Sequence, residues 1–346
     1  MIWLNKISRA FLPRVFLFVF AVGLQACATG PITPPTQLEA HPQAITIPYR
    51  ISEAGHIIID MSVNGHTAKP FIIDSGANTT AVYENHLNNF GLTPSGRFST
   101  VSGLVATALR PIADNVELQI GSKSFQRDKI VILETPPVDT GAVGLLGVDV
   151  LGDYAVVFNK ERLTATLIPS AQIDRDNFSG WRRIHLRNHI EFFPDNGLYF
   201  ANIFLKGEST PVLIDTGSEL NFVNWELASE DEEIAKLRKR LRKAVELQGA
   251  IDQISLEMRA VYYDVRLGNQ WWPEVDVVIL EFDTLNEIAP VDEPMMLAGA
   301  DMFSPKTFAF DFGGNAIYIH RGKVEDKPKF EEQSEDHLEP IWEDVD

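Results

Sequence analysis

The sequence of 346 residues contains a single cysteine, Cys27, and 30 basic residues against 48 acidic ones. With one cysteine no disulfide can form within the chain, so packing must supply the stability of the fold. The formal net charge of −18 argues against nucleic-acid binding through a basic surface. The chain also lacks G-x-S-x-G, H-E-x-x-H and a glycine-rich phosphate loop, which are signatures of serine hydrolases, zinc peptidases and nucleotide-binding proteins. His185 and His189 have helical metal spacing, but their surroundings are strand-like and no acid partner is evident, so we expect no metal and no cofactor.

Long apolar runs are scarce, and the run near the N-terminus, Val15 to Leu24, is too short to span a bilayer. It follows basic residues and ends on Leu24-Gln25-Ala26-Cys27. Residues 1–27 therefore predict a signal peptide. Its end resembles the lipobox of bacterial lipoproteins, which implies cleavage and lipidation at Cys27; the alternative is an ordinary signal peptide with an incidental cysteine. The resemblance implies an anchor on the periplasmic face of a bacterial membrane, and Ala28 favours the outer membrane.

Composition also divides the rest of the chain. Residues 28–43 contain four prolines and predict a flexible tether, whereas residues 323–346 hold ten acidic residues against three lysines and predict a disordered tail. Between them we expect a first lobe at 44–170, a polar linker at 171–182 and a second lobe at 183–322. A stretch rich in Glu, Lys, Arg, Leu and Ala predicts a helical insertion at 226–246 in the second lobe.

Two short segments contain the candidate functional residues: Phe71 to Thr80 and Val212 to Ser218. Each is an apolar run typical of a buried strand, followed by an acid, a hydroxyl residue and a glycine. Burying an isolated carboxylate costs free energy unless it is paired, hydrogen-bonded or protonated. The hydroxyl and the unhindered backbone after each acid can provide those partners.

The order of landmarks around the first acid repeats around the second. A turn glycine lies 9 positions before Asp74 and 8 before Asp215, and another glycine lies 29 and 34 positions after them. Both halves then reach an apolar-Gly-x-Asp element, and a phenylalanine follows its aspartate by 9 positions each time. The chain therefore predicts an internal duplication, with mostly short strands and little helix in each half.

One carboxylate from each lobe can meet its counterpart across a pseudo-twofold axis. Like charges a few ångströms apart cannot both ionise cheaply, so the pair shares one proton. The ionised acid can then take a proton from water while its partner donates one to a peptide carbonyl. This chemistry is peptide-bond hydrolysis without a covalent intermediate.

Over residues 44–322 the chain resembles the retropepsin-like aspartic proteases. Phe71 to Thr80 with Leu145 to Leu151, and Val212 to Ser218 with Leu297 to Phe303, are similar to the two signature elements of that family. The resemblance implies an all-β fold with minor helix, in which two tandem retropepsin- or pepsin-like β-barrel lobes form a bilobal aspartic protease. The roles that it implies fall on the following residues: Asp74 and Asp215 as the catalytic pair; Ser75, Gly76, Thr216 and Gly217 as support of the catalytic loops; Gly103 and Gly249 as flap tips; and Gly147, Asp149, Gly299 and Asp301 as a structural second element.

We therefore expect an aspartic endopeptidase that acts outside the cytoplasm on a peptide or protein substrate and is held at a lipid membrane through Cys27. Two motifs in one chain and a short linker favour a monomer whose lobes pair within the chain, although pairing between chains stays open. The other hypothesis is an inactive lipoprotein that uses the same fold to bind a peptide or a partner. Both acids keep their hydroxyl and glycine neighbours, which favours the enzyme.

Overall fold

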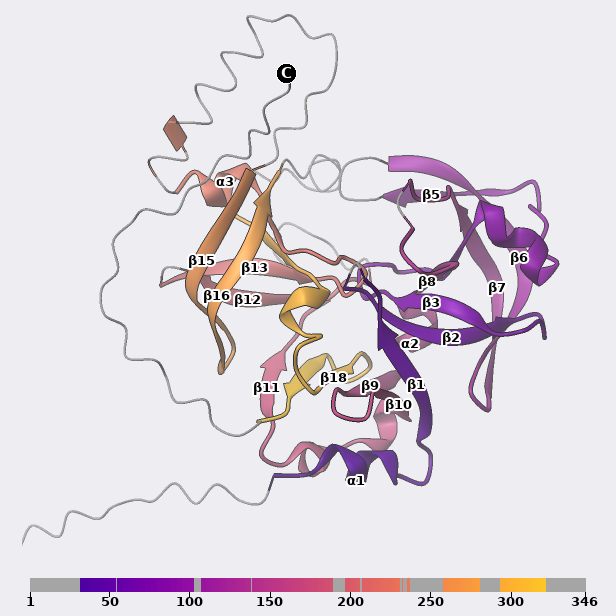
Figure 1. Ribbon diagram of the computed structural model, residues 1–346, viewed down its shortest axis with the longest axis horizontal. Helices are drawn as coiled ribbons and strands as arrows, with labels where there is room; N and C mark the ends of the chain where they lie inside the picture. Colours follow the sequence, from indigo (N-terminus) through magenta and orange to yellow (C-terminus); the bar gives the residue numbers. More distant parts are fainter. Residues whose placement is uncertain are drawn as a thin grey trace, which may run out of the picture.

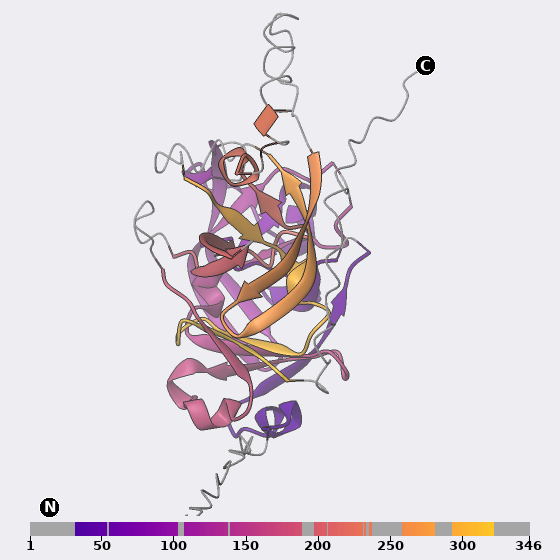
Figure 2. The same cartoon turned by 90° about the vertical axis from the view of Figure 1, so that its left-hand side faces the viewer.

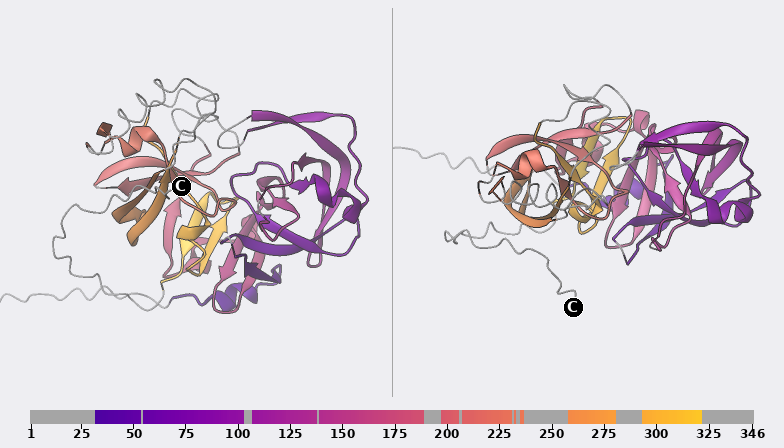
Figure 3. Two further views of the ribbon diagram at one scale, coloured as in Figure 1. Left: turned by 45° about the horizontal axis from the view of Figure 1, so that its top comes forward. Right: turned by 90° about the horizontal axis from the view of Figure 1, so that it is seen from above.

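The structure, a computed structural model, describes residues 32–53, 55–102, 107–137, 139–188, 197–205, 207–230, 232, 235–236, 258–280 and 293–321. Cys27, Gly103, Gly249, the tail 323–346 and most of the expected helix 226–246 lie outside these residues. Strands dominate, and they form two lobes that lie side by side (Figures 1 and 3). The expected all-β class with minor helix is confirmed.

The first lobe is built around a ring of six strands. Its elements are β1 (Ile45–Ile51), β2 (Ile57–Val63), β3 (Lys69–Ile73), β4 (Ala81–Tyr83), the 3-10 helix η1 (Glu84–Phe90), β5 (Phe98–Ser102), β6 (Thr107–Ile120), β7 (Lys123–Leu133), β8 (Gly144–Leu146), α2 (Val148–Leu151), β9 (Tyr154–Asn159) and β10 (Thr164–Pro169). Because β2 pairs with β6 as well as with β3, the order β2-β3-β8-β4-β7-β6 closes on itself. Apolar side chains that alternate along these strands fill the interior of the ring.

The second lobe repeats that ring. Its elements are β11 (Arg182–His185), β12 (Phe200–Leu205), β13 (Glu208–Ile214), β14 (Phe222–Val223), α3 (Trp225–Ala228), β15 (Met258–Leu267), β16 (Gln270–Ile279), β17 (Met296–Ala298), η4 (Ala300–Met302), β18 (Phe308–Asp311) and β19 (Ala316–Ile319). The closed barrel runs β12-β13-β17-β14-β16-β15, which is the strand order of the first ring. Turn glycines also correspond: Gly121 joins β6 to β7 and Gly268 joins β15 to β16, with φ of 55° and 57°. The tandem arrangement expected from the spacing of landmarks is thus visible in the topology.

A shared sheet, which we call the base sheet, joins the two lobes. It runs β11-β19-β18-β9-β10-β1, and its centre is the antiparallel pair β9 and β18, one strand from each lobe. Phe158 pairs with Phe308 across that junction, and their rings stack with centroids 4.7 Å apart. β1 continues from the base sheet into the first ring, because its N-terminal half pairs with β10 and its C-terminal half with β2. The two lobes are therefore connected by backbone hydrogen bonds as well as by the linker.

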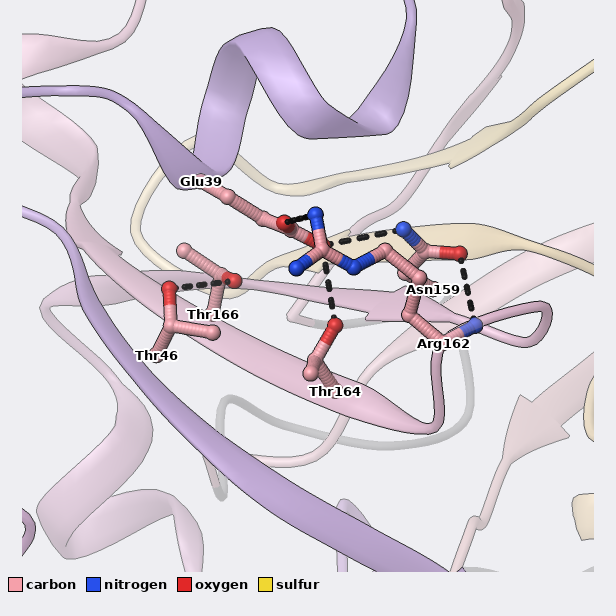
Figure 4. A network of polar contacts seen from close by, with 6 residues as sticks. All are labelled: Glu39, Thr46, Asn159, Arg162, Thr164 and Thr166. Atoms are coloured by element: carbon pink, nitrogen blue, oxygen red, sulfur yellow. Dashed lines mark hydrogen bonds and ion pairs between the residues drawn. The ribbon is translucent and has the colours of Figure 1, made fainter.

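The expectation of a flexible tether at 28–43 is wrong for the residues that the structure describes. Residues Pro35–Glu39 form a short helix, α1, on the base sheet (Figures 1 and 2). Leu38 is buried among side chains of both lobes and the linker: Val157, Ile168, Phe178, Trp181, Ala309, Ala316 and Tyr318. Glu39 accepts hydrogen bonds from Asn159 and Thr164 and forms an ion pair with Arg162 (Figure 4).

The linker is ordered too. It contains the 3-10 helices η2 (Ser170–Gln172) and η3 (Arg175–Phe178), the second of which begins with a capping box made by Asp174 and Asn177. The indole of Trp181 donates a 2.8 Å hydrogen bond to the backbone carbonyl of Thr33, so the linker also holds the segment before α1. No helix among the described residues is long and apolar enough to cross a membrane.

Candidate active site

Asp74 and Asp215 each stand at the end of a buried strand of their lobe. Asp74 follows the apolar strand β3, which pairs in parallel with β8. Asp215 follows the apolar strand β13, which pairs in parallel with β17. The backbone N–H of Asp74 donates to Leu146 at 3.0 Å, and that of Asp215 donates to Ala298 at 2.9 Å. Both acids are thus fixed to the strand that precedes the apolar-Gly-x-Asp element of their own lobe.

Ser75 and Thr216 lock the two loops together through four reciprocal hydrogen bonds. The Ser75 hydroxyl accepts from the N–H of Thr216 at 3.0 Å and donates to the carbonyl of Ile214 at 2.8 Å. The Thr216 hydroxyl accepts from the N–H of Ser75 at 3.1 Å and donates to the carbonyl of Ile73 at 2.8 Å. Both side chains are fully buried. Each hydroxyl therefore uses its donor and an acceptor lone pair across the boundary between the lobes.

Gly76 and Gly217 bring each loop against the acid of the other lobe. A Cβ added to Gly76 would lie 2.5 Å from the carboxyl carbon of Asp215, and one added to Gly217 would lie 2.2 Å from that of Asp74. Only glycine permits this approach. The same residues donate N–H hydrogen bonds to their own acids, Gly76 to Asp74 at 2.8 Å and Gly217 to Asp215 at 2.9 Å.

The two carboxyl groups lie close together, and each influences the ionisation of the other. Burial raises the pKa of Asp74 well above its ordinary value of 3.8, and the charge of Asp215 raises it further. Burial also raises the pKa of Asp215, while hydrogen bonds from Gly217, Asp74 and Ser218 and the charge of His56 oppose that rise. Two carboxyl groups this close together share a proton rather than carry two charges.

The second element of the first lobe supports the loop of Asp74 from below. Asp149, in α2, accepts hydrogen bonds from the N–H and the hydroxyl of Thr80 at 2.8 and 2.7 Å. The N–H of Gly147 donates to the Thr80 hydroxyl at 3.1 Å, and a Cβ on Gly147 would collide with the carbonyl of Ala77 at 2.7 Å. Arg127 lies 3.7 Å from the outer carboxylate oxygen of Asp149.

The second lobe builds the same support with a different residue. Asn221 takes the place of Thr80: its amide nitrogen donates to Asp301 at 3.3 Å, and its amide oxygen accepts from Gly299 at 2.9 Å. Thr80 and Asn221 are supporting residues that the sequence did not single out. Both stand six positions after their aspartate, so the repeat spacing contained the signal although the residue types differ.

His56 is another neighbour of the pair that the sequence did not single out. It precedes β2 in the first lobe, is 7 % exposed, and lies close to the backbone of Gly217 in the second lobe. Burial lowers the pKa of its imidazole from 6.5, and the charges of Glu219 and Asp215 raise it.

The flap candidates Gly103 and Gly249 lie outside the described residues. On either side of Gly103, β5 and β6 pair up to Ser102 and Thr107.

The arrangement joins the expected pair, Asp74 and Asp215, with Ser75, Gly76, Thr216 and Gly217 at one place between the lobes. Two carboxyl groups that share one proton provide a proton acceptor and a proton donor. These are the groups that general acid–base catalysis on a bound water requires. Within the described ranges, no three His, Cys, Asp or Glu side chains gather where they could hold a metal ion.

Comparisons with known proteins bear on the fold. Residues 59–153 match the profile of the family described as "gag-polyprotein putative aspartyl protease". Among solved structures, the chain is similar to an aspartic proteinase from Irpex lacteus, with a TM-score of 0.50 and 12 % identity over 82 % of this chain and 99 % of that one. It is also similar to conglutin gamma, a basic 7S globulin from lupine seeds, with a TM-score of 0.46 and 10 % identity over 82 % of this chain and 96 % of that one. Curated protein sequences give no match.

The chain therefore has the retropepsin-like aspartic protease fold in its bilobal, pepsin-like arrangement. The family profile covers most of the first lobe, including Asp74, Ser75, Gly76, Gly147 and Asp149. The similarity to the Irpex lacteus enzyme extends over nearly the whole length of that enzyme.

Proposed function

We propose that the chain is an aspartic endopeptidase whose catalytic pair is Asp74 and Asp215. One observation supports this proposal most directly: the carboxyl group of each acid lies against the glycine that follows the acid of the other lobe, and the loops that hold the two acids are locked by the reciprocal Ser75 and Thr216 bonds. Packing alone does not require such a pair, because two buried acids in contact oppose folding.

The chemistry follows from one proton shared by two acids. The ionised carboxyl takes a proton from a water molecule, whose oxygen adds to the carbon of the scissile peptide. The protonated carboxyl gives its proton to the peptide oxygen, and a tetrahedral diol forms. A proton then passes to the amide nitrogen, the carbon–nitrogen bond breaks, and a carboxylic acid and an amine leave while the pair regains one proton.

We also propose that Cys27 is lipidated and anchors the enzyme on the periplasmic face of the bacterial envelope. This part rests on the sequence, namely the basic, apolar and Leu24-Gln25-Ala26-Cys27 order of the N-terminus. The substrate would then be a peptide or protein of that compartment.

The first prediction concerns the two acids. With a fluorogenic peptide mixture, Asp74→Asn and Asp215→Asn should each lower kcat/KM by about 10²- to 10⁴-fold or more. The double variant should be no worse than either single variant, because the acids act as a unit. Activity should peak between the two macroscopic pKa values of the pair. Asp60→Asn is the matched control, since Asp60 is an exposed carboxylate on β2 of the same lobe.

Mixing the two inactive variants separates pairing within the chain from pairing between chains. If lobes of different chains formed the site, a mixture of the Asp74→Asn protein and the Asp215→Asn protein would regain part of the activity. We expect this mixture to remain inactive. Full activity of Asp215→Asn alone would mean that two first lobes form the enzyme. A chain that binds peptides without cleaving them at any pH would instead support the inactive lipoprotein.

Stability measurements show whether the variants are folded, and their pH dependence has a definite sign. The pKa of Asp74 is raised above 3.8 in the folded state, so the unfolded chain loses this proton first as the pH rises. Folding therefore loses free energy above about pH 4, and Asp74→Asn removes that loss. Urea unfolding should find the variant at least as stable as the wild type at pH 7, with the gain shrinking toward pH 3.

A further inference from the structure

The lobes touch at the active site through two contacts that correspond by symmetry. The register of β2 on β3 and of β12 on β13 makes Gly55 the counterpart of Gly197, and both have positive φ. A Cβ on Gly55 would lie 3.9 Å from Cβ of Glu219, and a Cβ on Gly197 would lie 3.6 Å from Cβ of Asn78. Glu219 and Asn78 each stand four positions after the aspartate of the opposite lobe.

The chemistry at these two contacts differs. His56 follows Gly55, whereas Leu198 follows Gly197, so a histidine stands next to the contact with Glu219 and a leucine next to the contact with Asn78. The charged contact lies beside Asp215: the imidazole is close to the backbone of Gly217, whose own N–H donates to the Asp215 carboxylate at 2.9 Å. Charge is therefore distributed unevenly around a pair of otherwise matching acids.

His56 is held in place by its own lobe. Its backbone N–H donates to the Ser52 hydroxyl at 3.1 Å, and that hydroxyl lies 3.4 Å from Nδ1 of the ring. Ser52 carries no charge, and Glu53 in the same turn is exposed to solvent. The charged groups that act on the imidazole are Glu219 and Asp215, both from the second lobe.

We propose that His56, together with Glu219, is a positioning residue that keeps the shared proton on Asp74, so that Asp215 is the carboxylate which takes the proton of the attacking water. A cation beside one of two coupled acids favours ionisation of that acid. The charge of Glu219 favours the protonated imidazole, and the contacts of His56 with Ser52 hold it beside the loop of Asp215. This assignment of roles rests on the proposed peptidase function.

The ionisation behaviour of the three groups is consistent with this assignment. The charge of His56 lowers the pKa of Asp215, whereas the pKa of Asp74 stands well above its ordinary value because of burial and the charge of Asp215. Burial lowers the pKa of His56, and the charges of Glu219 and Asp215 oppose that lowering.

The kinetic test compares pH profiles of kcat/KM. Removing the cation raises the lower macroscopic pKa of the pair, so His56→Gln and His56→Leu, the second of which copies Leu198, should move the acidic limb upward by about one pH unit. Glu219→Gln should move it in the same direction by less, because the imidazole then loses the carboxylate that favours its protonated form. His66→Gln is the control, because His66 is exposed at the β2–β3 turn. The proposal would be overturned if the acidic limbs of the kcat/KM profiles of the His56 variants coincided with that of His66→Gln.

An NMR titration of the His56 imidazole tests the same assignment without using activity. If the negative charge resides on Asp215, Asp215→Asn should lower the pKa of His56 by roughly half a unit or more. Asp74→Asn should leave it unchanged or raise it. The reverse order of effects would place the charge on Asp74 and overturn the proposal. A wild type without peptidase activity would refute the proposed function, and this titration would still decide where the charge lies.

Discussion

Two hydroxyl groups hold the active-site loops of the two lobes in register. Removing the Ser75 hydroxyl would leave the N–H of Thr216 and the carbonyl of Ile214 without their partner in a fully buried place. An unsatisfied buried group costs about 1–3 kcal/mol, which is more than the hydrogen bond itself contributes.

We predict that Ser75→Ala and Thr216→Ala each lower the free energy of unfolding by about 2–5 kcal/mol. Their effects should not add, because both variants break bonds of one network. Urea denaturation measures this. Ser218→Ala is the matched control: its hydroxyl donates to Leu220 within its own lobe and is only partly buried, so the loss should be about 1 kcal/mol. A Ser75→Ala variant no less stable than this control would contradict the prediction.

Residue patterns predict the two aspartates and the hydroxyl residues that link their loops, but not the residues around them. Asp74-Ser75-Gly76 and Asp215-Thr216-Gly217 are recognisable because acid, hydroxyl and glycine are consecutive. Thr80 and Asn221 do the same work with different chemistry, so identity of residue type could not reveal them. His56 comes to the loop of Asp215 from the other lobe, and no local pattern encodes a contact across 159 positions.

The helix α1 is the element whose behaviour the sequence predicted least well. Prolines at 34 and 35 suggested an extended tether, but proline is also well suited to the first turn of a helix. Five residues cannot form a stable helix alone. The packing of Leu38 and the bonds of Glu39 to Asn159 and Thr164 come from positions about 120 residues away, which local propensity does not register.

We predict that α1 contributes to the stability of both lobes. Leu38→Ala should lower the free energy of unfolding by about 2–5 kcal/mol, because the side chain packs against strands of both lobes and against the linker. Gln37→Ala, an exposed position one residue away, should change it by less than about 0.5 kcal/mol. Equal effects of the two substitutions in thermal and urea unfolding would show that α1 is not part of the folded unit.

The strand β6 is a second case in which local signals misled. Pro111 and the Asp114-Asn115 pair are typical of turns, so the local sequence favours two short strands with a break between them. The structure has one strand of 14 residues, which pairs with β5 at one end and β7 at the other. Pro111 faces Phe98 of β5, and β5 ends the strand order of the sheet.

For the molecule as a whole, the duplication predicts two lobes but not how they share a sheet. The junction of β9 with β18 depends on backbone pairing between segments about 150 residues apart, and each strand alone has the same apolar character as a core strand. The bilobal fold was therefore predictable from repeat spacing and family resemblance. The register of the base sheet was not.

The last prediction concerns attachment to the membrane. Cys27→Ala should abolish incorporation of labelled fatty acid and release the protein from the membrane fraction, because one thiol is the only attachment point that the proposal allows. Thr29→Ala, two positions later, should have no effect. Fractionation of the envelope and mass spectrometry of the mature N-terminus measure both. A mature chain that begins well beyond residue 27 would contradict the anchor.

The base sheet has the same strand order from either edge once each strand is exchanged for its counterpart, β1 for β11, β10 for β19 and β9 for β18. In an assembly of two identical subunits, such symmetry would oblige every residue to occur on both sides of the axis. Here the two lobes are different segments of one chain and can differ in sequence, so position 56 is histidine while its counterpart, position 198, is leucine. Covalent joining thus allows the two aspartates to have different surroundings, whereas the surroundings in a symmetric pair of identical subunits would be the same.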